Sequence, residues 1–333
     1  MLKKTLIAAL ALGVAMGTTA AVAQDPVSIV YIGKNTGNPY FDSITGGFED
    51  ACAALGCQFE FVAPATAEAT SQIPFIEAQI QRGVDVIAIA PNSPDALNQV
   101  LDAAKTAGII VLTVNGDITG SEQYRDATIL PTNFDIVGRD QVEMVGSLIG
   151  YEGEIAILSA TTEAPDQNKW IVGMNETLAS DPKYAKMTLV ATVYGDDQPE
   201  KSTTEMEALL SNYPNLKGVI APTTVGIAAA AQVVQSRGIA STVNVTGLGL
   251  PSEMRDFIKD GTVKAFQLWS PYNEGWLAVH FALGVIDGSI KNEVGSTFEV
   301  PNLGTVTINA NNSINTQAEL TTFNAENIDE FDF

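Results

Sequence analysis

The chain has 333 residues, of which 39 are acidic and 17 are lysine or arginine, so its formal net charge is −22. Binding to phosphate backbones and anionic lipids needs clustered basic side chains, so nucleic acid and acidic membranes are excluded as expected partners. The balance favours a neutral or cationic small molecule over a polyanion. This length exceeds what one hydrophobic core usually serves, so two domains are expected.

The first 23 residues have the three-part pattern of a secretory signal peptide. Lys3 and Lys4 precede the apolar run TLIAALALGVAMG, and Ala21-Val22-Ala23 forms a small-x-small cleavage site. A membrane anchor is the alternative, but the apolar run is shorter than a bilayer-spanning helix requires. We therefore expect an exported, soluble mature chain without membrane insertion, whose acidic excess becomes 24 once the two lysines are removed.

Strand-like and helix-like segments alternate over the first part of the mature chain. Apolar, β-branched runs predict strands at 27–33, 57–63, 84–91 and 109–115. Helical spacing, closed each time by a glycine, predicts helices at 41–56, 70–83 and 93–108. Such alternation implies right-handed crossovers and a parallel sheet that is covered on both faces.

The same alternation restarts after residue 132. Strands are expected at 153–160, 187–194, 216–223, 243–249 and 263–270, and helices at 134–150, 168–181, 200–214, 226–238, 251–261 and 272–287. The segment TFEVPNLGTVTI follows, and the last residues, 318–333, are polar without a clear periodic element. The fold class is therefore α/β, with two doubly wound parallel-sheet domains.

Cysteine and histidine are too sparse for a metal site. Cys52 and Cys57 are the two cysteines, five positions apart, and leave a local disulfide and two free thiols as open alternatives. His280 is the single histidine and lies in the helical stretch WLAVHFALGVI, where a packed helix residue is the expected role. No metal site and no cofactor are expected.

Polar side chains gather where the predicted strands end. In open parallel sheets, ligands bind beyond the carboxyl ends of the strands, so two facing sheets would place these ends around a shared cleft. The candidates there are Lys34, Asn35, Asn38, Asn92, Asn115, Asp117, Thr161, Asp166, Gln167, Pro222, Thr223, Thr224, Gly247 to Leu250, Trp269, Ser270 and Asn273.

Amides and carboxylates of this kind hydrogen-bond pairs of sugar hydroxyls, and the rings of Phe41, Trp170 and Trp269 can pack against the C–H face of a sugar. For a single residue the alternative is a helix cap, as for Asp166 at the start of its predicted helix. The convergence of several strand ends favours a binding cleft.

Catalysis has little support in the sequence. The lone histidine forms no Ser-His-Asp set, and HExxH, P-loop and CxxC motifs are absent. A pair of carboxylates for glycoside hydrolysis, Asp117 and Asp166, stays open because the sequence gives no distances. The chain is therefore not expected to be an enzyme.

Several strings together resemble the periplasmic sugar-binding proteins of ABC importers, of the ribose-binding type. These strings are PDQNKW, VIAPTT, PSEM, LWSPYNEG and FNAENIDEFDF. Within that family the rhamnose-binding proteins and the autoinducer-2 receptor LsrB are the most similar branches, over essentially the whole mature chain. A transcription regulator of similar build is disfavoured by the signal peptide and by the lack of an N-terminal helix-turn-helix.

The resemblance implies a ligand pocket at six positions. Four match the autoinducer receptor, and two depart from it: Asn115 replaces an aspartate and Thr224 an alanine. The departures favour a neutral deoxyhexose such as rhamnose over autoinducer-2, which stays the alternative. The expected ligand-binding residues are Lys34, Asn35, Asn38, Phe41, Asn115, Asp117, Asp166, Gln167, Trp170, Pro222, Thr224 and Trp269.

The resemblance also implies two lobes that close by bending at three chain crossings, near Pro131–Asn133, Trp269–Tyr272 and Pro301–Gly304. Residues 24–132 plus 271–302 would form the N-terminal lobe, and residues 133–270 plus 303–333 the C-terminal lobe. The expected partners of this periplasmic monomer are a small sugar and an ABC permease in the inner membrane.

Overall fold

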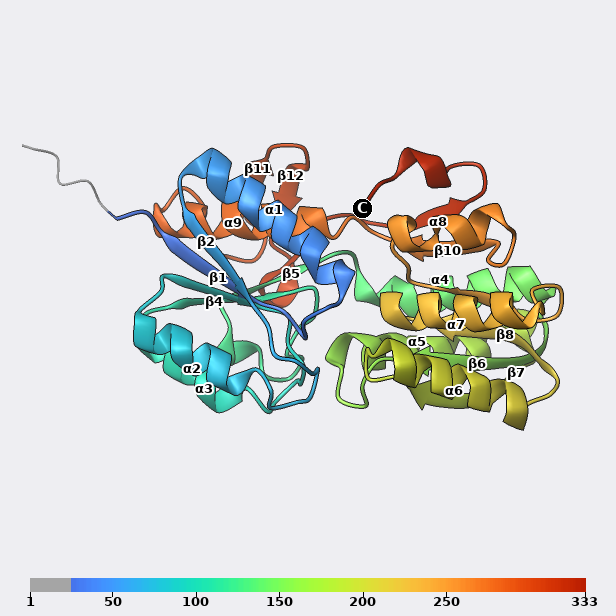
Figure 1. Ribbon diagram of the computed structural model, residues 1–333. Coiled ribbons are helices and arrows are strands. Elements are labelled where there is room, and N and C mark those ends of the chain that lie inside the picture. Colours follow the sequence, from blue (N-terminus) through green and yellow to red (C-terminus); the bar gives the residue numbers. More distant parts are fainter. Residues whose placement is uncertain (1–24) are drawn as a thin grey trace, which may run out of the picture.

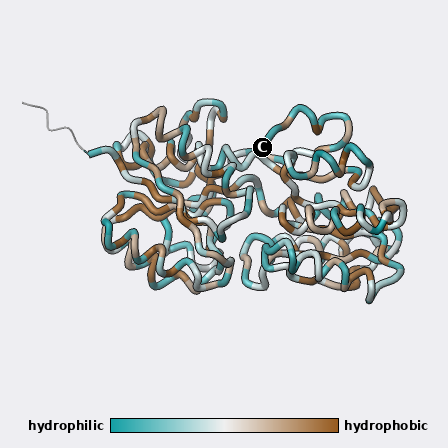
Figure 2. Tube along the Cα trace, viewed as in Figure 1, coloured by the Kyte–Doolittle hydropathy of each residue, from teal (hydrophilic) through white to brown (hydrophobic). Residues whose placement is uncertain are grey.

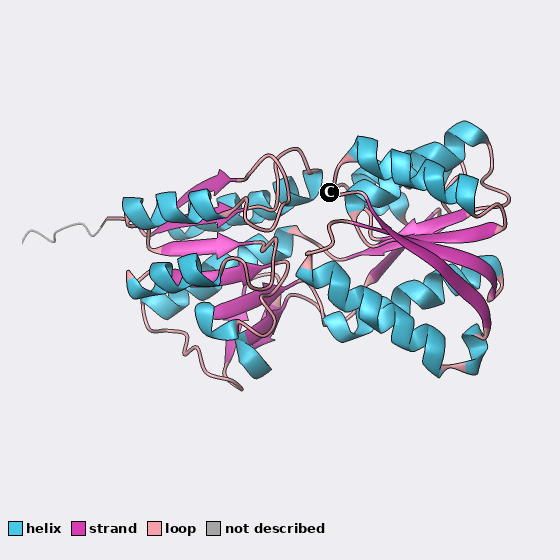
Figure 3. Ribbon diagram, turned by 90° about the horizontal axis from the view of Figure 1, so that it is seen from below, coloured by secondary structure: helices cyan, strands magenta, loops and turns pink. Residues whose placement is uncertain are grey.

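The computed structural model describes residues 25–333, so the expected signal peptide lies outside the described residues (Figure 1). Two α/β lobes lie side by side, each with helices on both faces of a parallel sheet (Figures 1 and 3). The expected fold class is thereby confirmed. Both halves owe it to the alternation of short apolar runs with amphipathic helical segments.

The first lobe is built on a six-stranded parallel sheet in the order β13-β5-β4-β3-β1-β2. Helices α1 and α9 cover one face, and α2 and α3 cover the other (Figure 1). Its strands are β1 (Ser28–Ile32), β2 (Gln58–Val62), β3 (Val86–Ile89), β4 (Ile110–Val114), β5 (Ala127–Leu130) and β13 (Ser313–Asn315). Its helices are α1 (Pro39–Leu55), α2 (Ile73–Arg82), α3 (Asn98–Thr106) and α9 (Tyr272–Ile286).

Alternation along the strands divides the core of this lobe between the two faces. On β1, Ile29 and Tyr31 pack in the core beneath α1 and α9, whereas Val30 and Ile32 pack in the core beneath α2 and α3. Because both faces are covered, the central strands β1, β3 and β4 are mostly apolar, which Figure 2 shows as hydrophobic segments running along the sheet. This double coverage leaves the strand ends as the exposed edge of the sheet.

The second lobe has a parallel sheet in the order β7-β6-β8-β9, which a bridge from Leu248 to Gln267 extends to the antiparallel pair β10 and β14. Its strands are β6 (Glu152–Ser159), β7 (Lys186–Tyr194), β8 (Leu216–Ala221), β9 (Asn244–Gly247), β10 (Ala265–Leu268) and β14 (Thr321–Asn324). Its helices are α4 (Phe134–Ile149), α5 (Pro165–Ser180), α6 (Pro199–Asn212), α7 (Thr224–Arg237) and α8 (Pro251–Lys259).

The polar C-terminal stretch contains a strand that its sequence does not signal. β14 pairs with β10, and Phe323 stacks on Phe266 with ring centroids 5.1 Å apart. Since β14 is an edge strand with one buried phenylalanine, its pattern is too short to be read as periodic. Tertiary pairing therefore forms this strand.

The chain passes between the lobes three times. The first two passages are residues 131–133, between β5 and α4, and residues 269–271, between β10 and α9. The expected third crossing at Pro301–Gly304 is wrong, because β11 (Thr297–Val300) and β12 (Gly304–Thr307) pair as a hairpin around it. The chain then adds β13 to the sheet of the first lobe, beside β5. It crosses at residues 316–320, so residues 303–315 belong to the first lobe.

The crossing segments are hydrogen-bonded to one another. The amide of Thr316 donates to the carbonyl of Leu130 at 2.9 Å, and its hydroxyl donates to the carbonyl of Pro131 at 2.8 Å. The amide of Ser270 donates to the side chain of Gln317 at 3.3 Å. The three crossings therefore form one connected hinge.

Cys52 and Cys57 form a disulfide between the end of α1 and the start of β2, which resolves the alternative that the sequence left open. His280 lies on α9 beside Trp276, with ring centroids 5.0 Å apart, and burial lowers its pKa. It is thus a packed, neutral helix residue. Within residues 25–333, no helix is long and apolar enough to span a bilayer.

Candidate functional site

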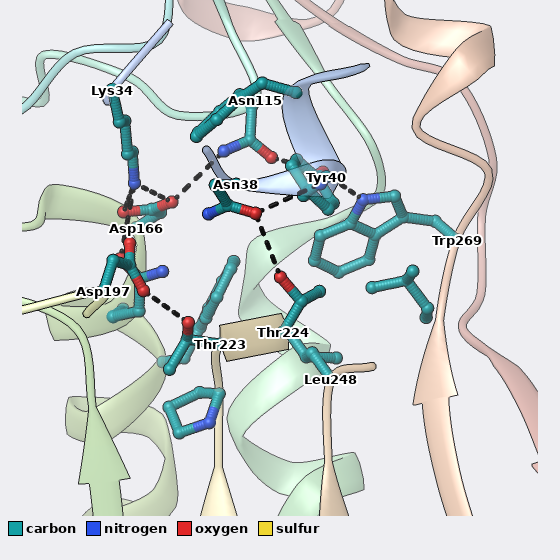
Figure 4. A pocket seen from close by; sticks show the side chains of 15 residues that line it. Lys34, Asn38, Tyr40, Asn115, Asp166, Asp197, Thr223, Thr224, Leu248 and Trp269 are labelled. Atoms are coloured by element: carbon teal, nitrogen blue, oxygen red, sulfur yellow. Dashed lines mark hydrogen bonds and ion pairs between the residues drawn. The ribbon is translucent and has the colours of Figure 1, made fainter. Parts of the chain in front are cut away.

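A cavity lies between the lobes at the carboxyl ends of strands from both sheets (Figure 4). Both lobes and the second hinge crossing contribute side chains. The cavity is lined by Lys34, Asn38, Tyr40, Phe41, Asn115, Asp166, Gln167, Trp170, Asp197, Pro222, Thr223, Thr224, Leu248, Leu268 and Trp269.

A buried ion pair joins the lobes inside this cavity. The ammonium of Lys34, just after β1, lies 2.8 and 2.7 Å from the two carboxylate oxygens of Asp166 on α5. It also donates to the amide oxygen of Gln167 at 3.4 Å. The exposed fractions of the two charged side chains are 3% and 0%. Because neither side chain is exposed to solvent, each charge in the closed cleft is compensated by the other.

The structure decides between the two roles that the sequence left open for Asp166. Ala164 is the N-cap residue of α5, and Asp166 lies in the first turn. Its carboxylate accepts from Lys34 and not from a backbone amide at the helix start. The positive end of the helix dipole stabilises a carboxylate there. Asp166 is therefore a cavity residue, not a cap.

Asn38 combines both roles. Its side-chain oxygen accepts from the amide of Tyr40 at 3.1 Å, which caps α1, and it also accepts from the hydroxyl of Thr224 at 3.4 Å. Thr224 begins α7 in the second lobe. This hydrogen bond is a second direct link across the closed cleft.

Tyr40 is the centre of a polar cluster in the first lobe. Its phenolic oxygen lies 2.5 Å from Oδ1 of Asn115, 2.7 Å from Oε1 of Glu274 and 2.6 Å from Nε1 of Trp269. Burial, together with the nearby Glu274, raises the pKa of Tyr40 well above its usual value. Burial also raises the pKa of Glu274 well above that of an exposed glutamate.

Asp197 is a second carboxyl group on the side of the second lobe. It follows β7 and accepts a hydrogen bond from the hydroxyl of Thr223. Burial raises its pKa, while the charge of Lys34 and the bond from Thr223 act in the opposite direction. A proton is therefore held more tightly here than on an exposed aspartate.

Aromatic and aliphatic side chains complete the walls. The rings of Trp170 and Trp269 meet edge to face with centroids 5.8 Å apart, and Phe134 packs against Trp170 at 5.1 Å. Phe41 and Leu248 also line the space. A small cavity that combines fixed polar groups with flat apolar surfaces suits a compact polyhydroxylated ring.

Ten of the twelve expected ligand-binding residues line this cavity, and two do not. Both oxygens of Asp117 accept from the guanidinium of Arg125, at 2.5 and 2.7 Å, and Asp117 faces a neighbouring hollow. Asn35 is buried but lies outside the cavity lining. Asp117 thus anchors Arg125. Asp166 also lines that hollow, but the two carboxylates are not a free pair, because Arg125 holds Asp117 and Lys34 holds Asp166.

Sequence reasoning missed Tyr40, Glu274 and Asp197. Asp197 follows a predicted strand, so the same strand-end criterion could have included it. Tyr40 lies between two residues already considered, Asn38 and Phe41. Glu274 carries no local signal, because a glutamate in the first turn of a helix is ordinarily solvent-exposed. Only the packing of α9 against α1 buries it.

Comparison with known proteins identifies the family. The family model described as Periplasmic binding protein domain matches residues 29–290. The chain belongs to this family. Its members are non-enzymatic solute-binding components of transport systems, in agreement with the expectation that the chain is not an enzyme.

Three solved structures resemble the chain over 92% of its length. A sugar ABC transporter protein from Actinomyces odontolyticus is 41% identical, with 98% of that chain covered and a TM-score of 0.74. A solute-binding protein from Clostridium phytofermentas with bound L-rhamnose is 34% identical, with 98% covered and a TM-score of 0.87. LsrB from Clostridium saccharobutylicum in complex with AI-2 is 24% identical, with 100% covered and a TM-score of 0.86.

Both branches expected from the sequence thus occur among the structural neighbours. The identity to LsrB is low enough that this likeness shows the fold alone. The chain is a sugar-binding component of an ABC transporter, and the comparisons leave the particular sugar unresolved.

Proposed function

We propose that the protein captures L-rhamnose or a closely related neutral monosaccharide in the periplasm and delivers it to an ABC permease by opening and closing its cleft. The observation that carries this proposal is the 34% identity, over 92% of the chain, to a solute-binding protein with bound L-rhamnose. The ligand is small, and the mature chain, residues 24–333, acts as a monomer.

The charges of the cavity support a neutral ligand. Lys34 and Asp166 neutralise one another at 2.7 Å, and burial favours the uncharged forms of Asp197 and Glu274. A charged ligand would add an uncompensated charge to a desolvated space, which is costly. Sugar hydroxyls can both donate and accept, so they match the mixed amide, carboxyl and hydroxyl lining.

The links between the lobes explain how ligand capture would couple to closure. The Lys34–Asp166 and Asn38–Thr224 contacts exist only when the two lobes meet. A ligand that adds contacts to both lobes shifts the population further toward the closed form. The hydrogen-bonded hinge permits this rotation as one unit. A permease that recognises the closed shape would then release the sugar by reopening the cleft.

A thermal-shift screen of residues 24–333 tests the proposal. The panel contains L-rhamnose, related hexoses and pentoses, polyols, and autoinducer-2 with and without borate. A ligand of the native state raises the melting temperature by mass action. We expect L-rhamnose or a close deoxyhexose to give the largest shift, and isothermal titration calorimetry then gives its affinity. No shift with any neutral sugar would contradict the proposal.

The alternative function is uptake and reception of autoinducer-2. It is favoured by four cavity residues that match the receptor pattern: Lys34, Asp166, Gln167 and Pro222. It is opposed by Asn115, whose amide nitrogen lies 3.5 Å from Asp166, because an aspartate there would bring two carboxylates together.

The Asn115→Asp variant separates the two functions. If the ligand is L-rhamnose or a related neutral sugar, this change weakens its binding because it adds a buried carboxyl beside Asp166. If the protein is an autoinducer receptor, the change restores the receptor residue and strengthens autoinducer-2 binding. Calorimetry with both ligands distinguishes the outcomes, and wild-type binding of autoinducer-2 alone would replace the proposed function by the alternative.

A further inference from the structure

Three polar groups meet around the buried phenolic oxygen of Tyr40 beside the cavity. The phenolic oxygen of Tyr40 contacts Asn115 Oδ1, Glu274 Oε1 and Trp269 Nε1, at 2.5, 2.7 and 2.6 Å (Figure 4 shows the contacts with Asn115 and Trp269). All four side chains are buried, with exposed fractions of 6% or less. Tyr40, Asn115 and Trp269 line the cavity, whereas Glu274 lies behind them.

The number of hydrogens available around the Tyr40 oxygen determines which group donates in each hydrogen bond. The indole of Trp269 can only donate, so the Tyr40 oxygen accepts from it. Tyr40 has a single hydroxyl hydrogen to give, but two further oxygens lie within hydrogen-bond distance. One of these two contacts therefore needs a hydrogen from the other partner, because two oxygens do not approach so closely without one.

The orientation of Asn115 selects which partner supplies it. The amide nitrogen of Asn115 points toward Asp166, at 3.5 Å from Oδ2. The reversed amide would set its oxygen against that carboxylate, which is unfavourable. Asn115 therefore presents its oxygen to Tyr40 and accepts the phenolic hydrogen. The remaining hydrogen, between Tyr40 and Glu274, must then come from Glu274.

We propose that Glu274 is a neutral carboxylic acid that donates to Tyr40 and so fixes the amide group of Asn115 toward the cavity as a hydrogen-bond donor. Glu274 is a positioning residue in this scheme, and Asn115 is the group that meets the ligand. The ligand atom opposite Asn115 must then be an acceptor, such as a hydroxyl or ring oxygen. The assignment of a sugar as this ligand rests on the proposed function.

The surroundings of Glu274 agree with a neutral form. Its exposed fraction is 0%, and its second carboxyl oxygen has no hydrogen-bond partner within residues 25–333. An ionised carboxylate would leave that oxygen desolvated and unpaired. The titratable groups that act on it are Tyr31 on β1, Tyr40 on α1, Asp166 and Lys34. Burial is the largest influence and raises the pKa of Glu274, and the charge of Asp166 adds to this effect. The hydrogen bonds with Tyr40 and Trp269 and the charge of Lys34 act in the opposite direction without outweighing burial.

Ionisation of Glu274 would reverse the polarity of the site. A carboxylate would take the Tyr40 hydrogen, and the Asn115 oxygen would then lie against an oxygen that has nothing to donate. Asn115 would turn its nitrogen toward Tyr40 and its oxygen toward the cavity. The same residue would then accept from the ligand, so the preferred ligand would differ between the two protonation states.

A ligand-free measurement tests the protonation state. Guanidinium unfolding of the wild type and of Glu274→Gln is compared from about pH 5 to about pH 9. The glutamine is isosteric and donates to Tyr40, but it does not titrate. Since the folded wild type holds a proton that the unfolded chain loses near the ordinary glutamate pKa, its relative stability falls as the pH rises. The wild-type folding constant, relative to the variant, should fall by nearly tenfold per pH unit until the folded pKa is reached.

A binding measurement tests the positioning role, with L-rhamnose as the probe at about pH 6. The affinity of Glu274→Gln should stay within about threefold of the wild type, because its amide replaces the donated hydrogen. Tyr40→Phe should lose more than about tenfold, because Asn115 is no longer held. Glu253→Gln is the matched control: this glutamate on α8 is raised in pKa by burial but lies away from the cavity. It should change the pH dependence of stability without changing affinity.

Two results would overturn the inference. A stability difference between wild type and Glu274→Gln that stays constant above about pH 5 would mean that Glu274 is ionised in the folded protein. A loss of more than tenfold in L-rhamnose affinity for Glu274→Gln would mean that the ionised form of Glu274 orients Tyr40 and Asn115 in the binding-competent protein. Glu274→Leu, which cannot titrate either, repeats the stability comparison if the glutamine variant does not fold. Failure of the wild type to bind L-rhamnose would contradict the proposed function and leave the stability result intact.

Discussion

In the first lobe α1 and α9 approach closely where Gly47 and Gly275 face the other helix, and in the second lobe α4 and α5 do so at Gly138 and Gly173. A methyl carbon at Gly47 would overlap the carbonyl oxygen of Tyr272, and one at Gly275 would overlap that of Ile44. In the second lobe only Gly138 is so confined, since a carbon at Gly173 would make an ordinary contact. The first lobe thus holds its site-bearing helices more tightly.

The two lobes also contain glutamates whose pKa values are shifted in opposite directions. Glu274 of the first lobe is fully buried, and burial raises its pKa. Glu143 of the second lobe is partly exposed. Burial is the largest single influence and opposes its ionisation, but hydrogen bonds from Lys183, Tyr151 and Tyr184 together outweigh it and lower the pKa to about 2. The comparison shows that access to solvent and donors, and not the residue type, decides the charge. The first lobe contributes the hydrogen-bonded cluster around Tyr40 to the cavity wall. The second lobe contributes the carboxylate of Asp166, whose charge Lys34 compensates when the cleft closes.

The largest expected effect comes from breaking the ion pair between Lys34 and Asp166. Lys34→Met leaves the buried Asp166 carboxylate without a cation in the closed form, which costs about 3–5 kcal/mol. We expect L-rhamnose affinity to fall by about two to three orders of magnitude in calorimetry. The Lys34→Met/Asp166→Asn double variant should regain part of this loss, because no lone charge remains. A loss of less than about tenfold in the single variant would show that closure does not depend on the pair.

A smaller effect, on the free energy of unfolding, is expected from substitutions at the close contact between α1 and α9. Gly47→Ala forces the α1–α9 contact apart and should lower the free energy of unfolding by about 1–3 kcal/mol. Gly46→Ala is the control, because a methyl carbon there would lie 3.9 Å from the Tyr272 ring. Urea unfolding of both variants measures the difference. Equal stability of the two would mean that α1 can shift away from α9 without penalty.

The smallest effect concerns the surface glutamate. Because the folded pKa of Glu143 is below its unfolded value, its contribution is present above the ordinary glutamate pKa and is lost as the pH falls toward about 2. Both partners are about two-fifths exposed, so the contribution is below about 1 kcal/mol. The stability gap between wild type and Glu143→Gln should shrink between about pH 5 and pH 2, opposite in sign to the trend for Glu274. A gap that grew on acidification would refute the comparison.

The two α/β halves follow from the amino-acid sequence alone, because apolar runs and amphipathic helices alternate locally and imply parallel sheets. The sequence also located Lys34, Asn115 and Asp166, since polar residues in the segments that follow buried strands lie at one edge of a sheet. These patterns lie within short segments of the chain, so they can be recognised without knowledge of tertiary contacts.

Tertiary structure alone decided the rest. The third crossing and β14 depend on pairing between segments far apart in the chain, with β13 beside β5 and β14 beside β10. Asp117 does not line the cavity, and both of its carboxylate oxygens accept hydrogen bonds from Arg125. The neutral Glu274 depends on the packing of α9 against α1, because the charge of a carboxyl group is set by the solvent and donors around it, and these come from other parts of the fold.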